Sequence, residues 1–334
     1  MQVPDGLIER LTSWRRVVVV GHVTPDADCL GAMFAAAAGF AEEGRRDVRL
    51  LLPEGSVSRK LAFMVEQARS AGADARALAE ADGILVVDTA RLDRCNVGPS
   101  IPDRWADGKD LVNIDHHASN TRFGRVNWVE PQAGSSSELI HRLLRDGERP
   151  ESPLMCSLLY AGIITDTAGF TLPTTGVETL RTAAELVAGG ADVADITRRL
   201  YRSRSEGEFQ LLQSVYANTR LAADGRIAYS TAGHEEITRT GCGPADIDDQ
   251  VSVPRSLGGV RIAMLLTEGI RGKTRINFRG EAGTRVLELA EALGGGGHAE
   301  SAGAILDMPL EQAVPLVLAR ATEYLNHPLH GQKP

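Results

Sequence analysis

Short runs of β-branched residues alternate with longer runs rich in alanine and leucine through the first two thirds of the chain. This alternation is typical of a parallel sheet whose strands are joined by crossover helices. It predicts strands at residues 17–20, 48–52, 84–87 and 111–114. It predicts helices at residues 29–43, 135–147, 153–165 and 177–188. In the helix predicted at 135–147, Ser135 and Glu138 form a capping-box pattern, and Gly147 ends the helix. We therefore expect an α/β protein.

The pattern changes beyond residue 191. Residues 192–221 look helical and arginine-rich, which indicates a connector. After it we expect strands at 226–231, 260–267, 274–279 and 302–306, and helices at 283–293 and 310–325. The predicted organisation is a parallel-sheet domain at 1–191, a helical linker at 192–222, a smaller α+β domain at 223–326 and a frayed tail at 327–334.

Aspartate and histidine residues gather where the predicted strands end. In an open parallel sheet the carboxyl ends of the strands meet at one crevice, which is where ligands bind. Three of the four clusters follow a strand, and the fourth ends an apolar segment that can reach the same rim. The clusters are His22, Asp26 and Asp28; Asp88; Asp115, His116 and His117; and Asp166.

These residue types suggest metal chemistry. Carboxylates and imidazoles together suit Mn²⁺, with Fe²⁺, Co²⁺ and Mg²⁺ as competitors, and the lack of cysteine in the set argues against structural zinc. One aspartate bridging two ions ~3.5–4 Å apart would make a centre that activates water and clamps the oxygens of a phosphate. The sequence therefore predicts a two-metal hydrolytic site.

Each residue also has a simpler structural explanation. A single aspartate at a strand end usually caps a turn or a helix, and Asp28 fits that role. Two imidazoles beside a carboxylate, as at residues 115–117, have no structural role in an ordinary loop. Taken together the clusters favour a metal site. The remaining histidines stay unassigned: His141 on the polar face of its helix, His234 in a surface loop, and His327 and His330 in the tail.

Composition limits the partners. The chain has 36 Lys+Arg against 44 Asp+Glu, a net charge of −8, which argues against a long nucleic acid as ligand. The positive charge that binds any phosphate must then come from metal ions or from a local cluster of arginines. No apolar run reaches the ~20 residues of a membrane span and the start lacks a signal-peptide pattern, so we expect a cytoplasmic protein with no membrane contact. The four cysteines sit singly, which predicts small buried side chains.

The second domain has a glycine run of its own. Four consecutive glycines, 294–297, follow a predicted helix and would let a phosphate or base approach the backbone closely. A flexible linker is the alternative, but the position between a helix and a strand favours a packed loop. We expect Gly295, Gly296, Gly297 and His298 to bind substrate, with Arg279 contacting a phosphate or stacking on a base.

The chain resembles the DHH phosphoesterases. The resemblance lies in GHVTPDADCLGA, VVDTA, IDHHASN and GIITDTAGF, in that order, and in GGGGHAESAGA of the second domain. It covers about residues 12 to 308 and is strongest to the nanoRNases, or bifunctional oligoribonuclease and 3′-phosphoadenosine 5′-phosphate (PAP) phosphatases. Two positions depart from the family pattern: Ala27 replaces a frequent glycine, and an arginine often found after the GF of the fourth motif is missing. Both put the substrate preference in doubt.

The resemblance implies a role for each site residue. His22 and Asp26 would hold one Mn²⁺, Asp28, His116 and Asp166 would hold the other, and Asp88 would bridge the two. Asp115 would orient His116, and His117 would face the substrate phosphate or the attacking water. A metal-bridging hydroxide would then attack phosphorus in line and release a nucleoside monophosphate.

The function predicted from this resemblance is hydrolysis of short oligoribonucleotides or linear or cyclic dinucleotides, with PAP as a further substrate. A manganese-dependent pyrophosphatase shares the metal motifs and is one alternative. A nucleotide-binding regulator without catalysis is another, although a binder would be expected to have lost a ligand and none is missing. The sequence leaves the preferred substrate, the native metal and a homodimeric state open.

Overall fold

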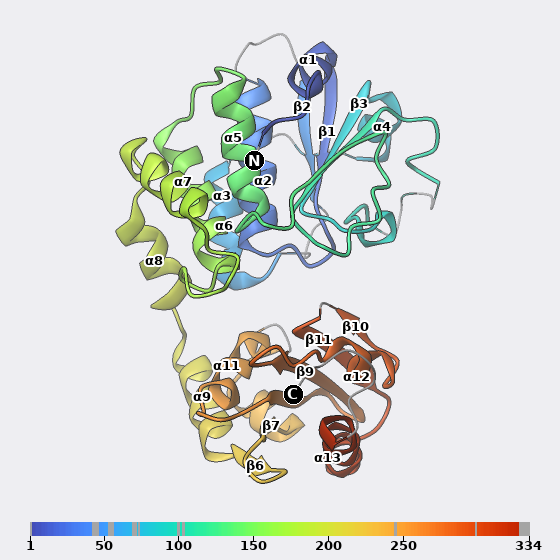
Figure 1. Ribbon diagram of the computed structural model, residues 1–334, viewed down its shortest axis with the longest axis vertical. Helices are drawn as coiled ribbons and strands as arrows, with labels where there is room; N and C mark the ends of the chain where they lie inside the picture. The colour runs from blue at the N-terminus through green and yellow to red at the C-terminus, as the bar shows by residue number, and fades with distance from the viewer. Residues whose placement is uncertain are drawn as a thin grey trace. The chain divides into compact units, whose positions relative to one another are not determined.

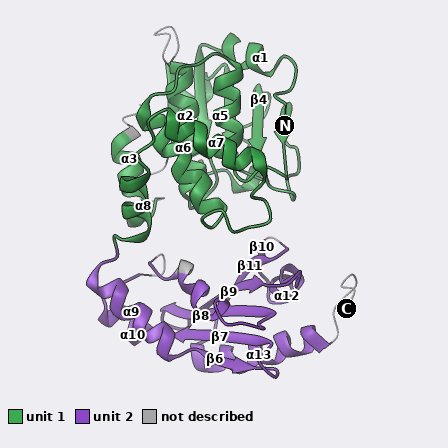
Figure 2. Ribbon diagram, turned by 60° about the vertical axis from the view of Figure 1, so that its left-hand side comes forward, with its two compact units in different colours: residues 1–203 green, residues 204–334 purple. Residues whose placement is uncertain are grey.

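The structure is a computed structural model that describes residues 2–41, 47–52, 57–68, 72, 74–98, 101, 104–243, 246–297 and 299–326. It divides into two compact units, Met1–Ser203 and Arg204–Pro334 (Figure 2). The division falls inside residues 192–222, which the sequence predicts to link two domains. Each unit is described by itself below.

A parallel sheet forms the centre of the first unit (Figure 1). Its strand order is β2-β1-β3-β4-β5, and each neighbouring pair is parallel. The strands are β1 Arg16–Val20, β2 Asp47–Leu51, β3 Gly83–Val87, β4 Leu111–Asp115 and β5 Val126–Val129. The four predicted strands are confirmed. The edge strand β5 was not predicted, because it is only four residues long and mostly half-buried, so it lacks the continuous apolar run of a central strand.

Helices cover both faces of this sheet. They are α1 Leu7–Ser13, α2 Ala27–Ala41, α3 Ala62–Ala68, α4 Ala75–Glu80, α5 Ser136–Asp146, α6 Pro153–Asp166, α7 Val177–Ala188 and α8 Val193–Tyr201. Val19 and Val87 point to the face where α2, α5 and α6 pack, whereas Val18 and Val86 point to the opposite core. All four predicted helices exist, and α5 has its N-cap at Ser135 and its C-cap at Gly147 as expected. The period-2 alternation of each strand thus fills two cores.

The second unit contains a mixed sheet of order β10-β11-β9-β8-β7-β6. Its strands are β6 Arg220–Ala222, β7 Ile227–Ala232, β8 Ile262–Ile270, β9 Lys273–Gly280, β10 Gly296–Gly297 and β11 Ser301–Leu306. Its helices are α9 Glu206–Ala217, α10 His234–Arg239, α11 Ser252–Arg255, α12 Leu287–Glu291 and α13 Leu310–Asn326. Only β7 and β8 pair in parallel. The expected α/β fold with a second α+β region is confirmed.

Two predicted helices needed correction. Residues 192–221 are two helices and a strand, because Ser205 caps α9 anew with a capping box to Glu208, and residues 220–222 pair with β7. The helix predicted at 283–293 is limited to α12, since Gly283 adopts a left-handed backbone angle and Val286, the N-cap, an extended φ of −123°.

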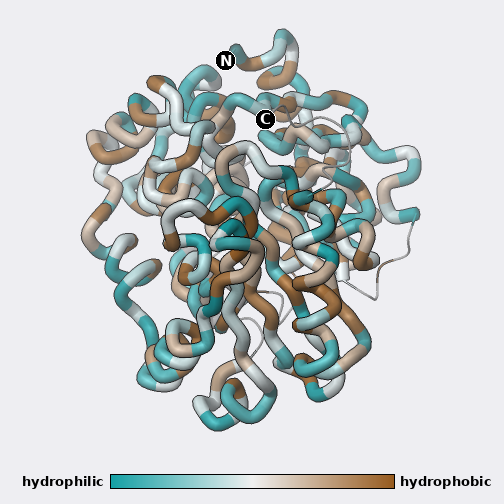
Figure 3. Tube along the Cα trace, turned by 60° about the horizontal axis from the view of Figure 1, so that its bottom comes forward, coloured by the Kyte–Doolittle hydropathy of each residue, from teal (hydrophilic) through white to brown (hydrophobic). Residues whose placement is uncertain are grey.

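Three of the four cysteines, Cys29, Cys95 and Cys156, are buried as predicted, whereas Cys242 is half-buried; all four are free. Among the residues that the structure describes, no helix is long and apolar enough to cross a membrane. Hydrophilic and hydrophobic positions alternate along the trace in Figure 3.

Candidate metal centre

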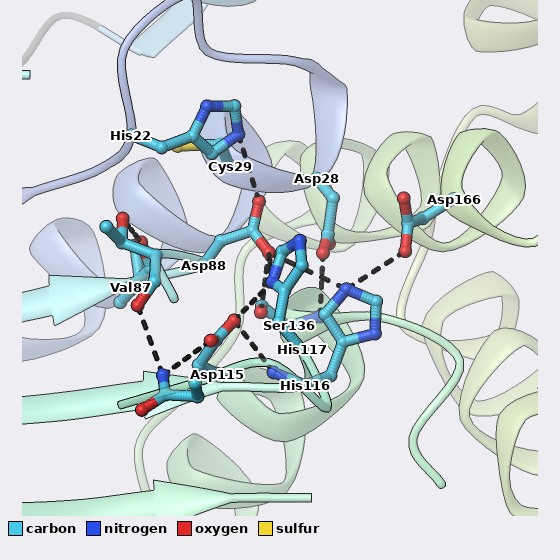
Figure 4. Close-up of polar contacts among 12 residues, drawn as sticks. His22, Asp28, Cys29, Val87, Asp88, Asp115, His116, His117, Ser136 and Asp166 are labelled. Atoms are coloured by element: carbon cyan, nitrogen blue, oxygen red, sulfur yellow. Dashed lines mark hydrogen bonds and ion pairs between the residues drawn. The ribbon is translucent and has the colours of Figure 1, made fainter. Parts of the chain in front are cut away.

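The ends of β1, β3 and β4 bring the predicted site residues of the first unit together (Figure 4). His22 follows β1, Asp88 follows β3, and Asp115 ends β4 with His116 and His117 directly after it. Two helices complete the group, with Asp28 in the first turn of α2 and Asp166 as the last residue of α6. Residues up to 144 positions apart therefore meet at one edge of the sheet, as the parallel topology requires.

Asp88 lies between two groups of side chains. Its Oδ2 is 3.3 Å from Nε2 of His22, and its Oδ1 is 3.7 Å from Nε2 of His116. Its backbone has a φ of 50°, a left-handed angle that Asp tolerates better than most residues, and its N–H donates to the carbonyl of Ile114. The side chain is 2% exposed. One carboxylate thus presents a different oxygen to each group, which is the geometry that a bridging ligand needs.

Backbone carbonyls orient two of the three rings that lie near Asp88. Nδ1 of His22 lies 2.8 Å from the carbonyl of Val23, and Nδ1 of His116 lies 3.3 Å from the carbonyl of Ala133. A carbonyl only accepts, so Nδ1 carries the proton in each ring. Nε2 then faces the carboxylates, and it is the nitrogen that a metal ion would bind once it is free of a proton.

Asp28 does not cap its own helix. Asp26 does so, because its Oδ1 accepts from the N–H groups of Asp28 and Cys29 at the start of α2. The Asp28 carboxylate instead accepts from the first two N–H groups of α5, with Oδ2 2.7 Å from the nitrogen of Ser136 and Oδ1 2.8 Å from that of Ser137. A helix N-terminus favours an anion, so this arrangement holds Asp28 in place with a lone pair left on each oxygen.

A close approach of α6 to α2 brings Asp166 into the group. A Cβ on Gly162 would lie 2.7 Å from Oδ1 of Asp28, so no larger residue fits there. Asp166 lies one turn further along α6, and its Oδ2 is 3.1 Å from Nε2 of His116. The glycine therefore allows the helix contact that positions the last carboxylate.

Asp115 contacts a different histidine ring from the one predicted. Its Oδ1 is 2.6 Å from Nδ1 of His117 and accepts the backbone N–H of His116, while the His116 ring is held by Ala133. Asn120 donates to Oδ2 of Asp115 at 2.6 Å. Asp115 therefore lies against the His117 ring instead of the predicted His116 ring, because the His116 ring turns toward the carbonyl of Ala133.

Sequence reasoning missed several residues of this group. Asn120 also donates to Oδ1 of Asn113 at 2.7 Å, which links the IDHHASN segment to β4. Ser136 donates from Oγ to Oδ1 of Asp88 at 2.9 Å. Glu138 is fully buried and accepts from the N–H of Gly134 and the hydroxyl of Thr179, rather than completing the predicted capping box. The polar run at 135–138 opening an otherwise buried helix was the available signal.

The charges in this group are unbalanced without a cation. Burial and the charge of Asp88 raise the pKa of Asp28 to about 7. Burial and repulsion from Asp28 likewise raise the pKa of Asp166. Burial opposes protonation of His116, but the charges of Asp88 and Asp28 outweigh it and raise its pKa. Protons here offset the same excess of negative charge that divalent cations would offset.

The donor sets fit hard or borderline cations. One ligand atom each from Asp28, His116 and Asp166 lies within 4.8 Å of the others, which is the set implied for one ion. On the other side His22 and Asp88 group with Cys29, and Oδ1 of Asp26 is 3.8 Å from Nε2 of His22. Burial raises the pKa of the Cys29 thiol to about 11, so it is a neutral thiol at neutral pH. The other donors of both groups are nitrogen and oxygen atoms, which suit these cations.

The glycine run of the second unit is packed rather than flexible. A Cβ on Gly295 would lie 2.0 Å from the carbonyl oxygen of Gly303, and one on Gly297 would lie 2.6 Å from the Cα of Ala302. Gly296 has open space around its Cα, and β10 pairs with β11 here. Arg279 lies on β9 opposite Ser301 of β11, at the same end of the sheet. His298 lies outside the described residues.

The other histidines differ from expectation. His141 is buried instead of lying on a polar helix face, with Nδ1 2.9 Å from Oε2 of Glu151 and Nε2 3.0 Å from Oε2 of Glu185. His234 is half-buried at the start of α10 instead of lying in a loop. His327 and His330 lie outside the described residues.

Comparisons with known proteins identify the class. Residues 16–163 match the DHH family, N-terminal domain. The match covers β1 to β5 and the helices from α2 to most of α6, which carry most of the side chains of the candidate metal centre. Within this class the chain is 27% identical to the bifunctional oligoribonuclease and PAP phosphatase NrnA of Thermus thermophilus, over 92% of this chain and 90% of the relative.

Two further likenesses extend this result. The cyclic-di-AMP phosphodiesterase GdpP of Geobacillus thermodenitrificans is 28% identical over 99% of this chain, which spans 50% of that relative. The crystal structure of an exopolyphosphatase-related protein from Bacteroides fragilis matches with a TM-score of 0.84 and 25% identity, over 96% of both chains. The likeness thus includes both units.

Proposed function

We propose that this protein is a Mn²⁺-dependent hydrolase that cleaves short oligoribonucleotides or linear or cyclic dinucleotides to nucleoside monophosphates, and that also converts PAP to AMP. The observation that carries the proposal is the position of Asp88, whose two oxygens face two separate sets of ligands. The substrate class is supported by the likeness to the Thermus enzyme over most of both chains.

The residues have distinct proposed roles. His22 and Asp26 hold one ion, Asp28, His116 and Asp166 hold the other, and Asp88 bridges them. Two bound cations would supply an activated water and neutralise charge on the phosphate. Asp115 accepts a hydrogen bond from Nδ1 of His117 and thereby fixes the ring that is proposed to contact the phosphate or the water. These donors suit Mn²⁺ with Mg²⁺, Co²⁺ or Fe²⁺ as substitutes.

A substrate panel tests the reaction. We would measure release of products from pGpG, pApA, cyclic di-AMP, PAP, a 5-mer RNA and pyrophosphate with Mn²⁺ present. Turnover of the short nucleotides without turnover of pyrophosphate is expected. Faster turnover of pyrophosphate would favour the pyrophosphatase alternative, and nucleotide binding without any turnover would favour a regulator.

The second unit is proposed to bind substrate through Arg279 and the backbone of Gly295–Gly297. Replacing Arg279 with Ala should raise KM by about tenfold and change kcat little, because a contact made equally in the ground and transition states affects binding alone. Arg271→Ala is the matched control, since that arginine is exposed on the same unit and pairs only loosely with Glu235. A large fall in kcat at unchanged KM would contradict this role of Arg279.

A further inference from the structure

One residue at the start of α5 contacts two carboxylates of the metal centre. The backbone N–H of Ser136 donates to Oδ2 of Asp28 at 2.7 Å, and its hydroxyl donates to Oδ1 of Asp88 at 2.9 Å. Asp28 belongs to α2 and Asp88 follows β3, so Ser136 links two segments that lie far apart in the sequence. All three side chains are buried.

The helix itself does not need the Ser136 hydroxyl. Ser135 is the N-cap of α5, and its Oγ accepts the N–H of Glu138. A serine in the first helical position adds little intrinsic helix stability. The buried hydroxyl instead makes a hydrogen bond to a carboxylate, which is about twice as strong as one between neutral groups. Its placement therefore points to the metal centre rather than to helix formation.

Asp88 needs this contact because its backbone alone does not fix its carboxylate. The left-handed φ of Asp88 places its Cβ, but rotation about the Cβ–Cγ bond of an aspartate is broad and roughly two-fold. The hydroxyl of Ser136 occupies one lone pair of Oδ1. The remaining lone pair of Oδ1 then points to the His116 group and Oδ2 to His22.

We propose that Ser136 is a positioning residue that holds Asp28 and Asp88 at a fixed separation and sets which oxygen of Asp88 each ion receives. This inference rests on the proposed function, because it assigns a role toward the same two ions. Two like charges buried side by side repel each other. By donating to both, Ser136 keeps the site preorganised before metal arrives.

Removal of the hydroxyl tests this role. Ser136→Ala keeps the N–H bond to Asp28 and loses only the bond to Asp88. We expect about 10- to 100-fold weaker Mn²⁺ binding by isothermal titration calorimetry. The Mn²⁺ concentration for half-maximal hydrolysis should rise in parallel, and KM at saturating Mn²⁺ should not change. Ser136→Thr, which keeps a hydroxyl, should restore most of the affinity.

Ser157→Ala is the matched control. Ser157 is a mostly buried serine of the same unit whose hydroxyl donates to the carbonyl of Pro153 and accepts from Asp192, at the far end of α6 from Asp166. Its loss should lower thermal stability by a similar amount and leave Mn²⁺ affinity unchanged. If Ser136→Ala does not fold, Ser136→Gly keeps the N–H, lacks the hydroxyl and should give the same Mn²⁺ result.

The outcomes separate the inference from the proposed function. Equal Mn²⁺ affinity in wild type and in the folded Ser136 variants overturns the positioning role and leaves the proposed function standing. A wild-type protein that binds Mn²⁺ but hydrolyses no nucleotide overturns the proposed function, while weaker Mn²⁺ binding by Ser136→Ala would still support the positioning role. Wild-type protein that binds no Mn²⁺ overturns both.

Discussion

Two clusters in the first unit both combine buried histidine with carboxylates, yet they differ in what each ring contacts. In the candidate metal centre, Nδ1 of His22 and of His116 faces a backbone carbonyl and Nε2 faces aspartates. His141 has a glutamate on each nitrogen, Glu151 on Nδ1 and Glu185 on Nε2. Arg145 also pairs with Glu185.

The difference shows how to separate a structural histidine from a metal ligand. A ring between two carboxylates is protonated, so His141 and Arg145 balance Glu151 and Glu185 within the cluster. A ring whose Nδ1 donates to a carbonyl leaves Nε2 as the nitrogen that a metal ion can bind. The candidate metal centre holds more negative charge than its own groups balance, and protons or added cations offset it. The partner of Nδ1, rather than the number of carboxylates, distinguishes the two clusters.

The largest expected effect comes from breaking the metal centre. Asp88→Ala or His116→Gln should lower hydrolysis by at least about 10³-fold, or about 4 kcal/mol of transition-state stabilisation, while the metal-free fold survives. The measurements are initial rates over a range of Mn²⁺ and circular dichroism. Asp82→Ala, at the opposite end of β3, is the control that should keep activity. Turnover of the Asp88 variant with added Mn²⁺ would refute the metal assignment.

The same histidine substitution in the other cluster should give the reverse result. His141→Gln should lower the free energy of unfolding by about 2–3 kcal/mol, because it leaves two glutamates without their shared cation. Mn²⁺ affinity and the rate per folded molecule should stay at the wild-type level. Chemical denaturation and calorimetry with Mn²⁺ measure the two quantities. Loss of Mn²⁺ binding in this variant would break the distinction between the clusters.

The response to pH sharpens the comparison further. Burial lowers the pKa of His141, but Glu151 and Glu185 outweigh it and raise the pKa above its ordinary value. The folded state therefore binds this proton more tightly than the unfolded chain. The resulting stability is complete below about pH 6.5 and is lost as pH rises through the folded pKa. The stability difference between wild type and His141→Gln should therefore shrink from pH 6 to pH 9, as chemical denaturation at each pH would show.

The metal centre should respond to pH in the opposite sense. Asp28 holds a proton with a pKa of about 7 in the metal-free protein, so Mn²⁺ must displace it at lower pH. Mn²⁺ affinity should therefore rise as pH increases from 5 to 7, by up to about tenfold per unit. Titration calorimetry in buffers of different ionisation enthalpy would detect the released proton. Affinity independent of pH would argue against a role for Asp28 as a ligand.

The fold was predictable wherever a local pattern coincided with a complete element. The strand at residues 17–20 and the helix capped by Ser135 carry their periodicity and caps in consecutive residues. The sequence pattern did not predict strands that form because they pair with an adjacent strand. Residues 220–222 are a strand only because β7 pairs with them, and β5 is recognisable only as the edge partner of β4.

For the metal centre, the sequence alone determined which residue types stand at which strand ends, since a parallel sheet brings those ends together whatever the loops do. Only the tertiary structure decided which side-chain atoms form hydrogen bonds and ion pairs with one another. Asp28 accepts from Ser136, 108 residues away, and His141 lies between two glutamates from other segments. Hydrogen bonds depend on positions within a few tenths of an ångström, and residue spacing along the chain carries no information at that scale across separate elements.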